Sequence, residues 1–332
     1  MTVLGPIAQY RRGRGQLEEP RAERGFFIFA HAPHHFFRGK QNRRFVYPAV
    51  YLIGFFSFVL SESSLWGATQ WLLNARTCGD AYEPYVGRWS RLVARQFVTW
   101  LGVPENNEWL DVGSGTGALC EVILAIASPR HVTGVDPSDG FVSFARHKVT
   151  DGRTTFQVGD AQKLLLADGS FDATVSGLVI NFIPDQEKAV NEMKRVTRPR
   201  GVVGAYVWDY AGEMQLMRHF WNAAVALDPN AAPLDEGRRF PVCSPEPLAA
   251  LFRKAGLAEV NTRSIDVPTI FRNFDDYWTP FLGGQAPAPG YCMSLSEDGR
   301  VALRDHIRAN LPIKSDGSIH LIARAWAVRG LR

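Results

Sequence analysis

Cysteine is scarce in this sequence and is never arranged in close pairs. The 332 residues include four cysteines: Cys78, Cys120, Cys243 and Cys292. Structural zinc sites and redox-active dithiols usually need a Cys-x-x-Cys spacing, and disulfide frameworks need denser cysteine. His31, His34 and His35 cluster near the N-terminus, without a cysteine or carboxylate at ligand spacing. We therefore expect no metal centre, and we expect a reducing compartment such as the cytoplasm.

The sequence also lacks an uninterrupted apolar run of the roughly 20 residues that a membrane helix needs. The uncharged run from Phe45 to Leu60 has 16 residues and is interrupted by Pro48 and Gly54. It follows a basic segment, since residues 1–44 hold nine Lys or Arg and three Asp or Glu. We predict that residues 1–75 are a disordered or dispensable extension, without stable membrane insertion. A peripheral or re-entrant membrane contact is the alternative.

The most informative stretch is residues 107–117, Asn-Glu-Trp-Leu-Asp-Val-Gly-Ser-Gly-Thr-Gly. A short apolar strand ends near Asp111, and the chain turns through Gly113, Gly115 and Gly117 into a helix. A carboxylate before the turn favours a ligand that carries a cation, whereas the start of a helix favours an anion. S-adenosylmethionine (SAM) meets both requirements, because its methionine end carries an ammonium and a carboxylate.

The same glycines also satisfy the dinucleotide-binding pattern Gly-x-Gly-x-x-Gly/Ala. Asp136 lies 19 residues after Gly117 and could hold an adenosine ribose in either class of ligand. Asp111 separates the two classes, because its carboxylate would repel a pyrophosphate. An NAD-dependent oxidoreductase is therefore the less favoured alternative.

Four further segments continue the strand–turn–helix succession: Val132 to Ser138, Phe156 to Ala161, Asp168 to Gly177 and Glu192 to Gly201. With the glycine loop, they resemble the class I SAM-dependent methyltransferases. Within this class they resemble the methyltransferase type 11-like branch, which includes the ubiquinone/menaquinone-biosynthesis C-methyltransferases. The resemblance covers about residues 80–332. One departure is Pro199-Arg200-Gly201, where the family usually has Pro-Gly-Gly.

The resemblance implies an α/β, Rossmann-like fold. Its sheet has seven mostly parallel strands, helices on both faces, and the last strand antiparallel between strands five and six. The strand–helix alternation over 108–208 also favours a parallel sheet. Strands four to seven are expected at 173–180, 202–208, 257–265 and 321–328, and helices at 81–102, 213–227 and 245–256. The stretches 209–244 and 266–320 do not fit the alternation, and we expect them to form a lid over the methyl acceptor.

The resemblance also implies which residues surround SAM. The methionine end would contact Asp111, Gly113, Gly115 and Gly117. The adenosine would contact Asp136, Asp160 and Ala161, and the sulfonium would lie near Ser176 and Gly177. Asp136 would accept hydrogen bonds from the ribose, and Asp160 and Ala161 would contact the adenine. Tyr82 and Tyr85 could lie near the ligand, whereas Trp89 better fits a core position.

Methyl transfer from a sulfonium is an in-line displacement, which needs a close and aligned nucleophile but no covalent enzyme intermediate. A base is needed only if the acceptor holds its proton. The candidates are Asp209 and Tyr210, just past strand five, and His219 on the next helix. Asp209 could equally cap a turn, and His219 could be a packed helix residue. The sequence therefore leaves the catalytic residues and the accepting atom open.

Nucleic acid is not the expected acceptor. The stretch after strand four, Asn181-Phe-Ile-Pro184, lacks the Asn/Asp-Pro-Pro-aromatic motif of amino-directed DNA methyltransferases, and no cysteine follows a proline. Beyond residue 44 the chain holds 28 basic and 30 acidic residues. This slight excess of negative charge disfavours a surface that binds the phosphate backbone of a nucleic acid. We expect a cytoplasmic monomer or weak homodimer that methylates a small molecule. The alternatives are a membrane-associated quinone or lipid methyltransferase and a SAM-binding protein without catalysis.

Overall fold

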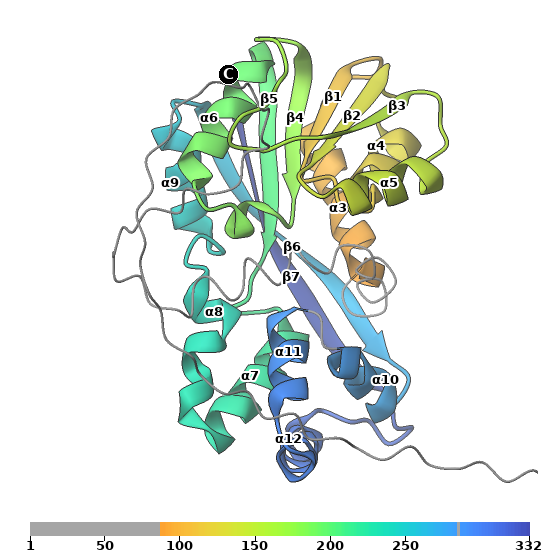
Figure 1. Ribbon diagram of the computed structural model, residues 1–332, viewed down its shortest axis with the longest axis vertical. Helices are drawn as coiled ribbons and strands as arrows, with labels where there is room; N and C mark the ends of the chain where they lie inside the picture. Colours follow the sequence, from red (N-terminus) through yellow and green to blue (C-terminus); the bar gives the residue numbers. More distant parts are fainter. Residues whose placement is uncertain (1–86, 284–285) are drawn as a thin grey trace, which may run out of the picture. The chain divides into compact units, whose positions relative to one another are not determined.

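A computed structural model describes residues 87–283 and 286–332 of the chain. The predicted extension over 1–75, its apolar run, and Tyr82 and Tyr85 lie outside these residues. Within the described residues, seven strands form one sheet in the order β3-β2-β1-β4-β5-β7-β6 (Figure 1). The strands are β1 (Glu108–Val112), β2 (His131–Asp136), β3 (Thr154–Val158), β4 (Phe171–Gly177), β5 (Thr197–Trp208), β6 (Ala258–Phe271) and β7 (Ile319–Leu331).

The direction of the strands confirms the predicted fold class. Neighbouring strands from β3 to β5 pair in parallel, and β7 runs antiparallel to both β5 and β6. The last strand therefore lies between strands five and six, as the resemblance implied. Parallel strands of this kind need crossover helices, and these helices cover the sheet.

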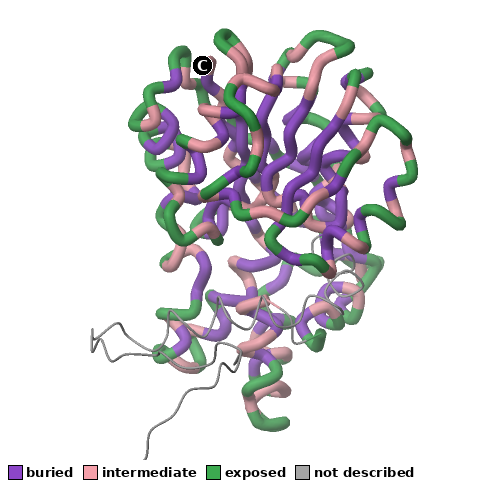
Figure 2. The backbone as a smooth tube through the Cα atoms, turned by 45° about the horizontal axis from the view of Figure 1, so that its top comes forward, coloured by how far each residue is buried: buried purple, intermediate pink, exposed green. Residues whose placement is uncertain are grey.

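Helices cover both faces of the parallel part of the sheet. They are α3 (Arg88–Leu101), α4 (Ala118–Ile126), α5 (Asp139–Lys148), α6 (Gln186–Val196) and α9 (Pro245–Lys254). On one face, Phe97 of α3 packs on Tyr206 of β5 with ring centroids 4.8 Å apart. On the other face, the Thr197 hydroxyl donates to the carbonyl of Met193 in α6 at 2.7 Å. The strands between these layers are consequently buried, as Figure 2 shows.

Local signals explain where these helices begin and end. The side chains of Ser138 and Asp185 accept hydrogen bonds from backbone N–H groups in the first turns of α5 and α6. Gly102 follows α3 with φ +66°, and Gly256 follows α9 with φ +71°, as expected for helix ends. Trp89 of α3 is buried and packs against Phe271 at 5.2 Å, so it is a core residue as anticipated.

The predicted bounds of several strands need correction. Strand β5 begins at Thr197 rather than at 202, and β7 spans Ile319–Leu331 rather than 321–328. Strand β4 ends at Gly177 rather than at 180, because Leu178 adopts φ +62° and a 3-10 turn, η2 (Ile180–Phe182), follows. Strand β6 continues to Phe271, six residues beyond the predicted end, and pairs with β7 throughout this extension. Pro268 does not interrupt it, because β6 is at the sheet edge, where a missing N–H is tolerated. The second insertion therefore begins after Phe271.

The two insertions pack together around the far end of the β6–β7 pair (Figure 1). We call residues 209–244 and 272–310 the helical insert. It contains α7 (Gln215–Leu227), η3 (Pro229–Leu234), α8 (Glu236–Arg239), α10 (Phe274–Trp278), η4 (Thr279–Gly283), α11 (Pro287–Ser294) and α12 (Glu297–Asn310). Phe220 of α7 stacks on Phe281 with centroids 4.5 Å apart, and the Tyr277 hydroxyl donates to the carbonyl of Leu216 at 2.9 Å. These contacts join the insertions into one layer.

None of the helices in residues 87–283 and 286–332 has the length and apolar character that crossing a membrane requires. The same part of the chain holds no group of three or more His, Cys, Asp or Glu residues placed to ligate a metal ion.

Candidate active site

The glycine turn after β1 has a backbone that larger residues would disturb. Gly113, Gly115 and Gly117 have φ values of +78°, +50° and +81°, in the left-handed region that favours glycine. The N–H of Gly113 donates to the carbonyl of Val135 at 2.7 Å, which ties the turn to β2. A Cβ on Gly113 would lie 2.5 Å from Cγ1 of Val179, whereas one on Gly115 would meet no atom within 4 Å. Gly115 therefore faces open space.

Asp111 is a buried carboxylate beside this turn, with one oxygen unpaired. Its side chain accepts a hydrogen bond from the Cys120 thiol of α4, at 3.3 Å on Oδ2. Its Oδ1 has no hydrogen-bond partner in the described part of the chain. Burial raises the pKa of Asp111 to about 7, and nearby Asp136 adds to the effect. A cationic group at Oδ1 would satisfy this oxygen and favour the ionised form.

Asp136 lies at the end of the neighbouring strand and connects the two motifs. Its Oδ2 accepts from the N–H of Gly115 and its Oδ1 from the N–H of Ser138, both at 2.9 Å. Burial raises the pKa of this carboxyl, and the two backbone N–H groups partly oppose the increase. Each carboxylate oxygen has a second lone pair, so Asp136 can still accept a hydrogen bond from a ligand hydroxyl.

Asp160 and Ala161 follow β3, the next strand along the same edge. Asp160 is exposed, and its Oδ1 accepts from the backbone N–H of Gln162 at 2.8 Å. Ala161 is 9% exposed. Asp111, Asp136 and Asp160 thus occur at or just after the carboxyl ends of three neighbouring parallel strands, where open α/β sheets bind ligands.

Ser176 and Gly177 end β4, and the structure gives them different surroundings. Ser176 is fully buried with an unpaired hydroxyl, and it shares a strand face with Thr174, which contacts Thr197 near α6. Its side chain therefore points to the face opposite Asp111, so a ligand contact would come from its backbone. Gly177 leaves room for Tyr206, since a Cβ there would lie 2.6 Å from the tyrosine hydroxyl.

The sequence reasoning did not identify Cys120 and Gln162 as partners of the site carboxylates. Cys120 contacts Asp111 nine residues away, and its thiol could have been noticed only from its place in the first turn of α4. Gln162 follows the Asp-Ala pair by one residue, but its type carries no signal for a cofactor loop.

Comparisons with known proteins identify the family of the chain. Residues 110–204 match the family described as "Methyltransferase domain". The chain is 31% identical over 177 residues to a demethylmenaquinone methyltransferase of Roseiflexus sp., covering 49% of this chain and 72% of that protein. It is also 31% identical over 170 residues to a ubiquinone/menaquinone biosynthesis C-methyltransferase of Methylobacterium nodulans, covering 46% and 67%. The chain belongs to the class I SAM-dependent methyltransferases.

SAM is therefore the cofactor of this methyltransferase, and the resemblance inferred from its motifs is confirmed. The oxidoreductase and non-catalytic alternatives are set aside by the same finding. Among solved structures, it aligns with the YcgJ protein from Bacillus subtilis at 18% identity and a TM-score of 0.49, covering 73% of this chain and 98% of that one.

The three candidate bases of the methyltransferase follow β5. The Asp209 carboxylate accepts from the N–H groups of Gly212 at 3.1 Å and Glu213 at 2.9 Å, so both oxygens stabilise a turn. Tyr210 is buried, with its ring 6.0 Å from that of Phe240. His219 is half-buried on α7, and burial lowers its pKa, which favours a neutral ring able to accept a proton near pH 7.

An aromatic group that the sequence analysis missed lies after the carboxyl ends of β4 and β5. Phe182 in η2 packs edge-on against Phe240, which follows α8, with centroids 5.2 Å apart. Phe240 also contacts Tyr210. Phe182 remains 37% exposed. Two segments more than 50 residues apart in sequence are thus in contact through these rings, which no local pattern could predict.

Proposed function

We propose that this methyltransferase holds the methionine end of SAM between Asp111 and the glycine turn. The observation that supports this most directly is the buried, unpaired Oδ1 of Asp111, because an unsatisfied buried acceptor is costly unless a ligand completes it. The SAM ammonium is suited to that oxygen. The open side of Gly115 leaves space for the cofactor to approach the backbone.

The adenosine half is assigned to the neighbouring strands. Asp136 accepts hydrogen bonds from the ribose hydroxyls, and Asp160 and Ala161 contact the adenine. Ser176 contributes through its backbone, and Gly177 lies near the sulfonium. When bound, SAM supplies a methyl group on a positively charged sulfur, which is already a strong electrophile. The protein's task is therefore to orient the two reactants and exclude water.

The proposed acceptor is a small molecule with a flat apolar part, such as a quinol-like ring. The exposed face of Phe182 and its neighbour Phe240 support this proposal. So do the names of similar proteins, which concern ubiquinone and menaquinone biosynthesis. The helical insert acts as the lid over this acceptor. If the acceptor atom carries a proton, Asp209, Tyr210 and His219 are the candidate bases.

We further propose that the methyltransferase works in the cytoplasm, where SAM is made, as a monomer or weak homodimer that does not act on nucleic acid. A membrane-associated methyltransferase acting on a quinone or lipid is the second candidate, favoured by the apolar run over 45–60.

Calorimetric titration tests the cofactor site. We expect the protein to bind SAM and S-adenosylhomocysteine in preference to NAD, and Asp111→Asn to weaken SAM binding at least tenfold. Asp266→Asn is the matched control, because Asp266 forms an ion pair with Arg324 at 2.7 Å on the edge strand. Equal losses in both variants would contradict the assignment of Asp111.

Methyl incorporation tests the acceptor. A panel of hydroquinones and phenols with tails of different length would be incubated with labelled SAM, and Phe240→Ala should raise the KM for the active compounds. Transfer to long-tailed compounds only in the presence of vesicles would favour the membrane-associated candidate. Transfer to none of them, with SAM binding intact, would refute a quinol-like acceptor.

A further inference from the structure

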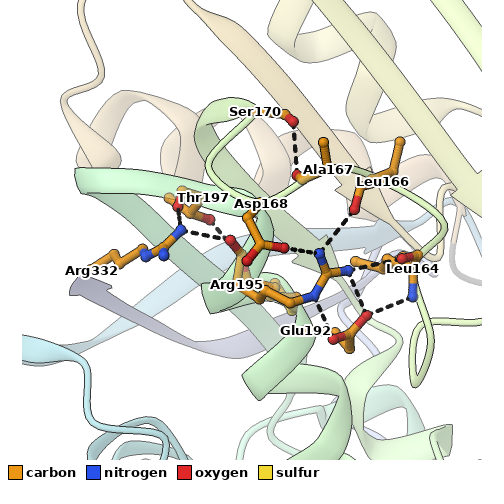
Figure 3. A network of polar contacts seen from close by, with 10 residues as sticks. Leu164, Leu166, Ala167, Asp168, Ser170, Glu192, Arg195, Thr197 and Arg332 are labelled. Atoms are coloured by element: carbon orange, nitrogen blue, oxygen red, sulfur yellow. Dashed lines mark hydrogen bonds and ion pairs between the residues drawn. The ribbon is translucent and has the colours of Figure 1, made fainter.

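The β3–β4 loop, residues 159–170, connects the proposed adenine contacts to the next strand and is held by one helix. It begins with Gly159, Asp160 and Ala161 and ends where β4 starts. Helix α6 supplies Glu192 and Arg195, whose side chains pair at positions i and i+3 on one face of the helix. Figure 3 shows Arg195 reaching from this helix into the loop, with Glu192 beside it.

Arg195 uses its whole donor set on this loop and on Glu192. Its Nη1 donates to the Leu166 carbonyl at 2.9 Å and to Asp168 Oδ1 at 2.5 Å. Its Nη2 donates to the Leu164 carbonyl at 2.9 Å. The remaining donors pair with the two Glu192 oxygens, both at 2.8 Å. These contacts match the five N–H donors of a guanidinium, so a lysine could not reproduce them.

Glu192 completes the attachment from the acceptor side. Its Oε2 accepts from the backbone N–H of Leu164 at 2.8 Å, so the backbone N–H and the carbonyl of this residue both contact α6 side chains. The Arg195 contact lowers the pKa of Glu192, and the Glu192 contact raises that of Arg195, so both stay charged at neutral pH.

The start of the loop is tied to the other end of α6. Gln162 donates through its side chain to Asp160 Oδ1 at 3.2 Å. Its own side-chain oxygen accepts from the backbone N–H of Asp185, the N-cap residue of α6, at 3.1 Å. Both ends of α6 therefore hold the residues that directly follow Asp160 and Ala161. The N-cap of the helix contacts Gln162, and its last turns contact Leu164.

We infer that Arg195 is a positioning residue for the adenine end of SAM, which acts by holding the β3–β4 loop against α6 so that Asp160 and Ala161 meet the base. This inference rests on the proposed placement of adenine at those two residues. It predicts that Arg195 contributes to the affinity for every ligand that carries an adenosine and not to contacts with the methionine end.

Titration of the full chain with SAM and with adenosine tests this directly. We expect Arg195→Gln to weaken both ligands by the same factor of about ten, because several charge-assisted hydrogen bonds to the loop are lost. Asp111→Asn should weaken SAM but leave adenosine unchanged. Arg253→Gln is the control, since Arg253 forms an exposed ion pair with Glu246 on α9. Unchanged adenosine affinity in a folded Arg195→Gln protein would overturn the inference.

A double-mutant cycle separates positioning from general stabilisation. If Arg195 acts through Asp160, the double variant Arg195→Gln, Asp160→Asn should lose less affinity for adenosine than the product of the losses in the two single variants. Independent effects would overturn the inference. Should Arg195→Gln fail to fold, Glu192→Gln serves in the same cycle, and Arg195→Lys should restore only part of the affinity. A wild-type protein that binds neither SAM nor adenosine would instead refute the proposed cofactor site.

Discussion

If the methionine end of SAM binds at Asp111 as proposed, the charge on this carboxyl should control the affinity for SAM. In the free protein, burial holds the pKa of this carboxyl at about 7. An ammonium favours the ionised form, so binding below pH 7 must release a proton. We predict that the Kd for SAM is nearly constant above pH 7 and rises about tenfold for each pH unit below it. Calorimetry between pH 6 and 8, in buffers of different ionisation enthalpy, would detect both effects.

Asp111→Asn provides the control for this pH dependence. The variant should bind SAM weakly, with an affinity that changes little over the same pH interval. A wild-type affinity that is equally constant from pH 6 to 8 would show that Asp111 does not face the ammonium.

The same carboxyl also makes the stability of the unliganded protein depend on pH, with the higher stability at low pH. Its folded pKa is about 7 against 3.8 for the ordinary group, so the folded state binds more protons between these values. Buried Glu236, which accepts a hydrogen bond from Trp221, also has its pKa raised by burial to about 7. Both contributions to stability are present below pH 4 and are lost as the pH rises through 7.

We therefore predict a fall in the stability contribution of these groups from pH 5 to 8. It should be smaller in Asp111→Asn and in Glu236→Gln than in the wild type, when denaturant midpoints are compared. Saturating SAM should reduce the fall in the wild type. Identical pH profiles for all three proteins would contradict the assignment.

Three glycines allow backbone strain and ligand contact to be separated. Gly317→Ala measures strain alone, because Gly317 has φ +84° and no atom within 4 Å of an added Cβ. We expect it to lose roughly 1–2 kcal/mol of stability. Gly115→Ala should lose a similar amount but weaken SAM at least tenfold, since its methyl group enters the open space beside the turn. Gly113→Ala should lose more stability, because Val179 must move.

Circular dichroism melts and SAM titrations of the three variants check this prediction. If Gly115→Ala bound SAM as tightly as Gly317→Ala, the cofactor would not approach the turn at Gly115.

At the scale of elements, the sequence predicted the parts of the fold that depend on local patterns. The glycine turn, the acidic strand ends and the glycine after α9 each need a specific residue at a specific place, so they could be located. The extension of β6 to Phe271 depends on pairing with β7, about 50 residues away, and was missed. The end of β4 was missed because the left-handed conformation of Leu178 has no glycine to announce it.

The site shows the same division. Asp111 and the glycines belong to one contiguous stretch, and Asp136 ends the next strand, where it contacts Gly115. The contact between Phe182 and Phe240 joins η2 to the helical insert, and the attachment of the β3–β4 loop to α6 joins two separate elements. Such contacts are set by packing, which a single sequence does not display.

The turn after β5 gives a prediction for Asp209. Its carboxylate accepts two backbone hydrogen bonds, so we expect Asp209→Ala to lose about 1–2 kcal/mol of stability. Asp209→Asn keeps one acceptor oxygen and should lose less. Methyl transfer, once an acceptor is known, should persist in Asp209→Asn. Loss of transfer with unchanged stability would instead make Asp209 the base.

At the scale of the whole molecule, all seven strands of the described sheet lie between residues 108 and 331. We predict that deletion of residues 1–75 leaves folding and SAM affinity unchanged, within about twofold. Circular dichroism and calorimetry of the shortened protein would check this. An unfolded product or a loss of SAM binding would show that the extension is an integral part of the enzyme.

The place of β7 in the sheet has a consequence for biosynthesis. Strand β7 lies between β5 and β6 and pairs with both of them. The two strands are therefore not joined in the sheet until residues 319–331 have been made. During translation, one edge of β5 therefore stays unpaired while more than 100 further residues are made. An unpaired strand edge can pair with other chains and so promotes aggregation. The nascent methyltransferase should therefore depend on chaperones until residues 319–331 have been made and β7 can pair with both strands.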